Sequence, residues 1–379
     1  MIFGIPREIK PNEYRVGAMP FLVKELTRRG HQVLVETGAG DFCNASDSSY
    51  ERAGATVVPS PEKLYASARA ILKVREPQPV EYDLISPDQI IFAFFHFIKN
   101  PDLVKAMAAR GSTSFAYEFV EDANHDHPIS KPISRITGQM AALNGAFYLQ
   151  KHVGGRGIVL GQVTGSPTAQ VTILGAGNVG QQAAITAAKL GAHVTVLDTN
   201  FNKLQQLDAL GLHNVTSLIL TEEFLKEILP QTDLLIACIQ VADKKTPRLI
   251  TPEMVKTMRP GSVIVDVDID LGGSVETCKV TTLENPVFIL HDVVHYCVSN
   301  ITSAVPRIAS RALSAAIMPY ILTIADKGLE KAVLDDPYLA GGLSVYKGYV
   351  VKQSLAEIAD LPLADIRQKI KDLNPGDHA

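Results

Sequence analysis

The chain has 379 residues, of which 46% are hydrophobic and 20% are charged, and its formal net charge at pH 7 is −4. These values exclude a disordered protein, and the length favours two domains over a single hydrophobic core. Because charges of both signs are spread along the chain without long single-sign blocks, we expect neither nucleic acid nor a membrane as a partner.

The cysteines and the apolar runs bear on compartment and metal binding. Four cysteines are scattered without a CxxC spacing, which argues against a disulfide framework or a structural metal site and fits a reducing compartment. The opening "MIFGIPREIK" meets charge too early for a signal peptide. The longest apolar runs, "IIFAFFHFI" and "ALSAAIMPYILTIA", are too short to span a bilayer, and the second contains Pro319. We therefore expect a cytoplasmic protein.

The first third of the chain alternates short β-rich runs with amphipathic helical stretches. One of these stretches, "PFLVKELTRRG", ends on Gly30, which is typical of a helix C-terminus. The alternation predicts a mostly parallel sheet covered by helices on both faces. The predicted strands are residues 2–5, 31–36, 55–59, 71–74, 90–95 and 114–119.

A second α/β series follows a predicted helix over residues 134–149 and the glycine-rich stretch "GGRGIVLGQVTG". Its predicted strands are residues 171–175, 193–198, 234–238, 262–267 and 287–293. Residues 305–379 look largely helical and have no sheet of their own, so we expect them to pack on the first series. The predicted fold is α/β with two doubly wound parallel-sheet domains. Residues 1–131 with 305–379 form a discontinuous substrate domain, into which a Rossmann dinucleotide-binding domain of residues 132–304 is inserted.

The clearest motif is "VTILGAGNVGQQAAITAAKLGAHVTVLDTN", in which G-x-G-x-x-G follows an apolar strand and opens an alanine-rich helix. Its first glycine permits a tight turn, the second lets a pyrophosphate approach the backbone, and the third allows close packing of helix on strand. Asp198 ends the next strand, where a carboxylate accepts from a ribose 2′-hydroxyl and repels a 2′-phosphate, so we expect NAD as the cofactor rather than NADP. The predicted cofactor-binding residues of this motif are Gly175, Gly177, Asn178, Val179, Gly180 and Asp198.

Ligands of open α/β sheets bind outside the carboxyl ends of the strands, and several polar residues follow predicted strands here. In the first domain these residues are Arg15, Arg75, His96 and Glu118, and in the second they are Asp266, Asp268, Asp270 and Asn300. Hydride exchange with a nicotinamide needs a fixed substrate pose, which an arginine–carboxylate fork supplies, and a proton carrier, for which histidine is the usual choice. The set therefore favours an oxidoreductase acting on a small carboxylate.

Each of these residues also has an ordinary structural interpretation. His96 follows an apolar run and taken alone resembles a packed core histidine, while an isolated arginine such as Arg15 is more often a solvated loop cation. Glu118 is interpreted as a buried structural acid or an exposed strand end, without a functional assignment. Asp266 and Asp268 would serve to hold the backbone of the glycine turn that follows them. The prediction of a site depends on several such residues gathering at one edge.

The order and spacing of many motifs resemble those of the alanine dehydrogenase family, which is related to the NAD-binding subunit of proton-translocating transhydrogenase. The resemblance covers essentially the whole chain. The motifs are "GIPREIKPNEYRVG", "ELTRRGHQVLVETGAG", "FFHF", "GGRG", "GAGNVG", "DIDLGG", "HDVVHYCVSNITSAVP" and "MPYILTIADKG".

This resemblance implies that L-alanine, NAD and water interconvert with pyruvate, ammonia and NADH, and that the protein is a homo-oligomer, commonly a hexamer. It implies that Arg15 binds the substrate carboxylate, that His96 is the acid/base residue and that Asp270 is a catalytic aspartate. It further implies that three residues lie at the cofactor or in the active-site cleft: Ser134, Asp198 and Asn300.

The chain departs from the family pattern at three places. The family sequence "KVKEP" reads "KVREP" here, so Arg75 replaces an active-site lysine. Arginine substitutes for lysine in holding a carboxylate, but it does not give up its proton. "IQVADKKTP" stands in place of a "VPG"-type turn, and "DIDLGG" in place of "AIDQGG", which affects the expected cofactor geometry and substrate choice.

Two alternative functions remain open. In the first, pyruvate condenses reductively with an amino acid side chain, as in the related carboxyethyl-ornithine synthases, and Arg75 holds a second carboxylate. In the second, the chain is a weakly catalytic NAD-binding sensor. The presence of Arg15, His96 and Asp270 argues against the sensor, because a binding module has no chemical need for that set.

Overall fold

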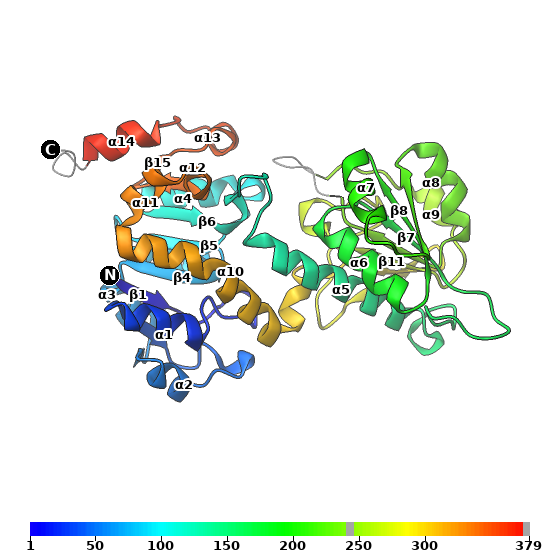
Figure 1. The fold of residues 1–379 in the computed structure, drawn as a ribbon, viewed down its shortest axis with the longest axis horizontal. Coiled ribbons are helices and arrows are strands. Elements are labelled where there is room, and N and C mark those ends of the chain that lie inside the picture. Colours follow the sequence, from blue (N-terminus) through cyan, green and yellow to red (C-terminus); the bar gives the residue numbers. More distant parts are fainter. Residues whose placement is uncertain (240–245, 374–379) are drawn as a thin grey trace. The chain divides into compact units, whose positions relative to one another are not determined.

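The computed structural model describes residues 1–239 and 246–373 (Figure 1). The chain divides into two compact units, of which the first comprises Met1–Ile133 with Val305–Ala379 and the second comprises Ser134–Ala304. Both are built on a mostly parallel sheet with interleaved helices, which confirms the predicted fold class. The segment "IQVADKKTP", a departure from the family pattern, lies largely outside the described residues.

The sheet of the first unit has eight strands in the order β15-β14-β6-β5-β4-β1-β2-β3. The strands β1 to β6 pair in parallel, while β14 runs antiparallel to β6 and β15 antiparallel to β14. Their bounds are β1 (Ile2–Ile5), β2 (Gln32–Glu36), β3 (Thr56–Val58), β4 (Ala70–Arg75), β5 (Ile90–Phe94), β6 (Thr113–Ala116), β14 (Leu343–Tyr346) and β15 (Tyr349–Val350).

Helices cover both faces of this sheet because its central strands are apolar on both sides. Alternate residues of β5 belong to different buried clusters: Phe92 packs with α1 and α10 on one face, and Ile91 packs with α3, α4 and α13 on the other. The helices of the unit are α1 (Pro20–Arg28), α2 (Asp47–Arg52), α3 (Pro61–Ser67), α4 (Pro101–Ala109), α10 (Pro306–Lys327), α11 (Leu329–Asp335), α12 (Pro337–Ala340), α13 (Gln353–Ala359) and α14 (Ile366–Leu373).

The C-terminal stretch is largely helical, as expected, but it also contributes β14 and β15, which the sequence did not predict. The expectation that its apolar run is too short to cross a bilayer was wrong, because α10 has 22 residues and alone among the described helices meets the length and composition of a membrane span. Half of its most apolar window is buried, and Leu313, Ile317 and Ile321 are fully enclosed in the core of the first unit.

The sheet of the second unit has seven strands in the order β12-β13-β11-β10-β7-β8-β9, and all pairs are parallel except β12 with β13. Its strands are β7 (Gln170–Leu174), β8 (His193–Asp198), β9 (Val215–Ile219), β10 (Leu234–Ala237), β11 (Val263–Asp266), β12 (Val287–Leu290) and β13 (Val293–Tyr296). Its helices are α5 (Ser130–Tyr148), which begins in the first unit, α6 (Asn178–Lys189), α7 (Phe201–Asp208), α8 (Glu222–Ile228) and α9 (Pro252–Thr257).

Two predictions for this sheet were wrong. The single strand expected over residues 287–293 is a hairpin, in which His291 and Asp292 both have left-handed backbones and form the two-residue turn. The strand β9 was missed because its side chains are only partly buried and carry no apolar run.

Candidate active site

The end of β4 carries a bulge that determines where the side chains point. From Leu72 to Arg75 this strand advances three residues while its partner β5 advances two, from Phe92 to Phe94. One extra residue in a strand bends it and redirects its side chains, which is common beside active sites. Arg75 is the last residue of β4, and its side chain is only 9% exposed.

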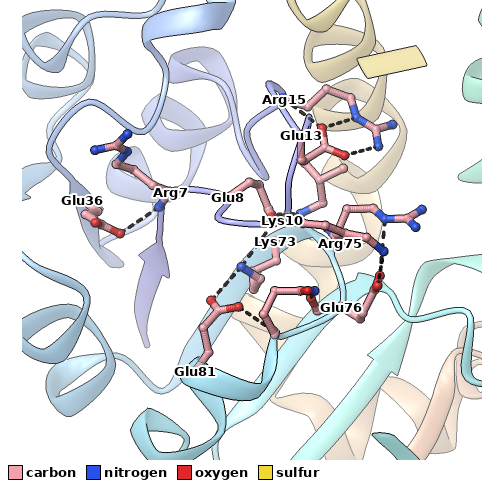
Figure 2. A network of polar contacts seen from close by, with 12 residues as sticks. Arg7, Glu8, Lys10, Glu13, Arg15, Glu36, Lys73, Arg75, Glu76 and Glu81 are labelled. Carbon is pink, nitrogen blue, oxygen red and sulfur yellow. Dashed lines mark hydrogen bonds and ion pairs between the residues drawn. The ribbon is translucent and has the colours of Figure 1, made fainter. Parts of the chain in front are cut away.

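The bulge encloses a buried ion cluster formed by Lys73, Glu8 and Glu81 (Figure 2). Lys73 is fully buried, with its Nζ 2.8 Å from Glu81 Oε1 and 3.2 Å from Glu8 Oε2. Burial by itself lowers the pKa of Lys73, but the two carboxylates outweigh it and raise this pKa above its ordinary value, so the lysine stays charged. Glu8 Oε1 also accepts from the backbone N–H groups of Val74 and Arg75, at 2.5 and 3.4 Å. The cluster therefore fixes the backbone from which Arg75 projects.

Arg75 lies against His96, which follows β5. Its Nη1 is 2.6 Å from His96 Nε2, and its Nε is 3.3 Å from Glu76 Oε2. His96 has a left-handed backbone, with φ of 51°, which is uncommon for a residue other than glycine. The carboxylate of Glu118 supports this conformation by accepting from His96 N at 2.6 Å and from Phe95 N at 3.1 Å.

The electrostatic environment keeps the His96 imidazole neutral. Burial lowers its pKa well below the ordinary 6.5, and the positive charges of Arg75, Lys99, Lys10 and Arg15 lower it further. In contrast, burial raises the pKa of Glu118 to about 7, although its backbone hydrogen bonds act in the opposite direction. A neutral imidazole surrounded by cations suits a base beside an anionic substrate.

Arg15 is a buried residue, so the interpretation as a solvated loop cation was wrong. It is 3% exposed, and Glu13 binds it in a bidentate manner, with Nε–Oε1 and Nη2–Oε2 distances of 2.7 and 2.6 Å (Figure 2). The following loop is held by α10, where Ser310 Oγ accepts from Val16 N and Ser314 Oγ accepts from Met19 N. Arg15, Arg75 and His96 thus come together at the carboxyl edge of one sheet.

In the second unit, the glycine-rich turn between β7 and α6 has the shape that a dinucleotide needs. A Cβ on Gly175, which has φ of 101°, would lie 2.5 Å from Cys238 O, and one on Gly180 would lie 1.8 Å from Gly175 O. A Cβ on Gly177 would meet nothing within 4 Å, so that side of the turn is open. Gly177 is also the N-cap of α6 and provides no side-chain cap for its first turn. Uncapped N–H groups at a helix N-terminus suit a pyrophosphate.

Asp198 ends β8 beside this turn, as the motif predicts. Its Oδ2 accepts from Ala176 N and its Oδ1 accepts from Asn200 N, both at 2.7 Å. Each carboxylate oxygen has a second lone pair for a ribose hydroxyl. The backbone of this unit therefore fits a dinucleotide, whose phosphates would lie on the Asn178–Val179 end of α6.

The remaining predicted residues of the second unit divide into two groups. Asp266 is 1% exposed and accepts from Ser274 N and Val275 N, so it holds the backbone, and burial raises its pKa to about 6. Asp270 accepts a hydrogen bond from Ser299 Oγ, and Ser299 precedes Asn300 in the chain. Ser134 lies on helix α5 rather than at the end of a strand.

Sequence reasoning did not assign roles to several residues of the first unit that support the site. These residues are Glu8, Glu13, Lys73, Glu81 and Glu118. One signal was present for Lys73, since a lysine inside the apolar run "ILKV" is buried only with a partner.

Known proteins resemble the chain over nearly its full length. The family models "Alanine dehydrogenase/PNT, N-terminal domain" and "Alanine dehydrogenase/PNT, C-terminal domain" match residues 4–137 and 141–353. An alanine dehydrogenase of Mycolicibacterium smegmatis is 40% identical over 97% of this chain and 99% of its own length, and one of Bacillus subtilis is 42% identical over 94% of each.

Solved structures give the same result. An L-alanine dehydrogenase superposes with a TM-score of 0.89 at 38% identity, covering 98% of this chain and 100% of that one. A transhydrogenase from Sinorhizobium meliloti superposes with a TM-score of 0.81 at 26% identity, covering 93% of this chain and 100% of that one.

Proposed function

We propose a reaction and a set of site residues for this chain on the premise that it belongs to the alanine dehydrogenase/PNT family. It is an amino-acid dehydrogenase that uses a nicotinamide cofactor and a small-molecule substrate. The reaction is the oxidative deamination of L-alanine to pyruvate and ammonia, together with the reverse reductive amination. The observation that carries the proposal is the neutral His96 beside the buried Arg15 and Arg75.

The second unit binds the cofactor. The turn Gly175–Gly180 and the first turn of α6 hold the pyrophosphate, and Asp198 accepts from a ribose hydroxyl. The negative charge of Asp198 repels a 2′-phosphate, so the cofactor is NAD rather than NADP. By family resemblance, Ser134 and Asn300 also belong to the cofactor site and the cleft.

The first unit binds the substrate. The carboxylate of alanine pairs with Arg15, oriented by Glu13, and with Arg75, anchored by the buried lysine cluster. When bound, the nicotinamide supplies the hydride acceptor for the Cα of alanine. His96 accepts a proton from the water that attacks the resulting iminium, and Asp270 assists the transfer of protons.

A spectrophotometric assay of the purified full chain tests the proposal. We expect NADH formation from L-alanine and NAD at alkaline pH, and NADH consumption with pyruvate and ammonia. Arg15→Met removes a charge-assisted carboxylate contact, and we expect it to raise KM for alanine by roughly one to two orders of magnitude. The control Arg28→Met alters an exposed arginine of α1 and leaves KM unchanged. Binding of NAD without turnover in either direction would contradict the proposal.

A second candidate function is favoured only by Arg75. Its rigid fork suits an additional carboxylate, as in the reductive condensation of pyruvate with an amino acid. The same assay, run with pyruvate, NADH and a panel of amino acids in place of ammonia, separates the two reactions.

Assembly and location are also part of the proposal. By family resemblance the chain forms a homo-oligomer, commonly a hexamer, and its location is cytoplasmic. Light scattering of the protein as it elutes from a size-exclusion column measures the mass of the assembly.

A further inference from the structure

The contact between Arg75 and His96 determines which atom of the imidazole carries a proton. A guanidinium has five N–H donors, no acceptor, and does not deprotonate in a protein. At 2.6 Å, Arg75 Nη1 must therefore donate, and His96 Nε2 must accept through its lone pair. The ring proton of a neutral His96 then resides on Nδ1.

The charged groups near His96 favour a neutral ring. The positive charges of Arg75, Lys99, Lys10 and Arg15 oppose a second ring proton. The carboxylate of Glu118 accepts from the backbone N–H of His96 rather than from the ring. Phe94 stacks on the imidazole with the ring planes at 17°. None of these contacts supplies an acceptor that would stabilise an imidazolium.

The same guanidinium is the proposed partner of the substrate carboxylate. Its Nε edge faces Glu76, at 3.3 Å from Oε2. A bidentate carboxylate would therefore use the edge formed by Nη1 and Nη2, which includes the atom that donates to His96. Nη1 has two N–H groups, so both acceptors can use it at once, and release of His96 requires the anionic carboxylate, the stronger acceptor, to turn the guanidinium away from the ring.

We propose that Arg75 is a positioning residue for His96: it fixes the Nδ1–H tautomer by donating to Nε2, and a bound carboxylate frees that nitrogen by turning the guanidinium toward itself. The inference rests on the proposed function of these two residues in substrate binding and proton transfer. In the free enzyme His96 is then neutral, but its Nε2 lone pair accepts a hydrogen bond from Arg75. Only a substrate with a carboxylate makes that lone pair available to accept a proton. An uncharged residue at position 75 would leave the base exposed to solvent protons in the absence of substrate.

The test is ¹⁵N NMR of the full-length protein labelled only at histidine, with the His96 signals assigned by their loss in His96→Gln. In the wild type we expect a protonated Nδ1, an unprotonated Nε2 and no titration over the range in which an ordinary histidine titrates. In Arg75→Met the ring loses its donor to Nε2, so we expect both neutral tautomers and a titration that moves toward that range, although burial still opposes the charged ring. Arg75→Gln, which retains an N–H donor without charge, keeps the tautomer but recovers part of the titration. A wild-type His96 that is protonated on Nε2 or titrates normally overturns the proposal.

The proposed loss of the Arg75–His96 hydrogen bond on carboxylate binding, the release step, is tested with pyruvate. NADH is present and ammonia is absent. We expect pyruvate to shift the Nε2 signal in the wild type and to leave it unchanged in Arg75→Met. If calorimetry detects pyruvate binding to the wild type while the Nε2 signal stays in place, the release step is overturned.

The pH dependence of kcat/KM tests the proposal further, because a purely structural role of Arg75 would not change it. The acidic limb of kcat/KM for alanine should lie at lower pH in the wild type than in Arg75→Gln. If the chain has no turnover with alanine but His96 has the expected tautomer, the proposed function fails and the tautomer assignment stands.

Discussion

Glu118 is the residue whose ionisation couples most directly to the candidate site. Its carboxyl group holds the left-handed backbone of His96, yet burial raises its pKa from 4.5 to about 7. An acid with a raised pKa in the folded state binds more protons folded than unfolded. Its contribution to stability is therefore complete below the unfolded pKa and is lost as pH rises through the folded value.

We expect the free energy of unfolding of the first unit to fall by on the order of 3 kcal/mol from acidic to alkaline pH because of Glu118 alone. Glu118→Gln keeps an acceptor oxygen for the backbone of His96 but has no charge to bury, so it should flatten this dependence. Urea unfolding of both proteins at a series of pH values measures the difference. The partly exposed neighbour Glu121 is the control, since Glu121→Gln should retain the wild-type slope. Parallel pH curves for wild type and Glu118→Gln would show that the pKa of this carboxyl group is the same in the folded and unfolded states.

The sequence identified Arg75 and His96 because both follow apolar strands, and the carboxyl ends of parallel strands meet at one edge. It did not identify the partners of Lys73, because a buried ion pair depends on which loops pack over the strand end. It also gave no indication that His96 adopts a left-handed backbone, which depends on Glu118 from a neighbouring strand connection.

At the scale of elements, α10 holds the loop that follows Arg15 from a distant part of the sequence. Two serines on its buried face accept the N–H groups of Val16 and Met19, the ends of this loop. Gly17 lies between them, where a Cβ would be 2.1 Å from Leu72 O, so this loop is pressed against β4. The helix and the strand therefore hold this loop from two sides.

Replacing both serines, in Ser310→Ala with Ser314→Ala, leaves two backbone N–H groups without their acceptors. We expect a loss of stability of about 1–3 kcal/mol for each and a higher KM for alanine, because Arg15 is no longer held in place. Chemical unfolding and steady-state kinetics measure the two effects. On the same helix, Thr323→Ala removes a hydroxyl that donates to the carbonyl of Pro319 and should change KM little. An unchanged KM in the double variant would separate the loop from substrate binding.

Elements with strong hydrophobic patterns were predicted well, and elements that depend on a partner were not. The central strands of both sheets are apolar runs whose character is independent of context. In contrast, β14 is a strand because β6 offers it a free edge, and β9 is a half-exposed strand at the edge of its sheet. The hairpin at His291 and Asp292 lacks the glycine that usually signals such a turn.

At the scale of the whole molecule, the two units have separate sheets and separate hydrophobic cores. A ligand that binds one unit stabilises that unit by mass action, by about 2.7 kcal/mol at a concentration of one hundred times Kd. The proposed NAD site lies wholly on residues of the second unit.

We therefore expect NAD to slow amide hydrogen exchange in β7, α6 and β8 and to leave β4 and β5 nearly unchanged. Mass spectrometry of peptides from the full chain, with and without NAD, measures this pattern. Gly177→Val fills the open side of the turn and should abolish the protection without altering exchange in the first unit. Equal protection of both sheets by NAD would contradict separate binding.

The insertion of one unit within the other has a consequence for biosynthesis. The strand β6 leaves the ribosome with one edge unpaired, and its neighbour β14 is translated only after the complete second unit. At ~5–20 residues per second, the roughly 230 intervening residues keep that edge open for ~10–45 s. During this interval the nascent first unit also lacks α10, which covers one face of its sheet. An incomplete sheet with an unpaired edge strand is prone to pair with other chains. The order of translation therefore favours binding of the nascent first unit by a chaperone.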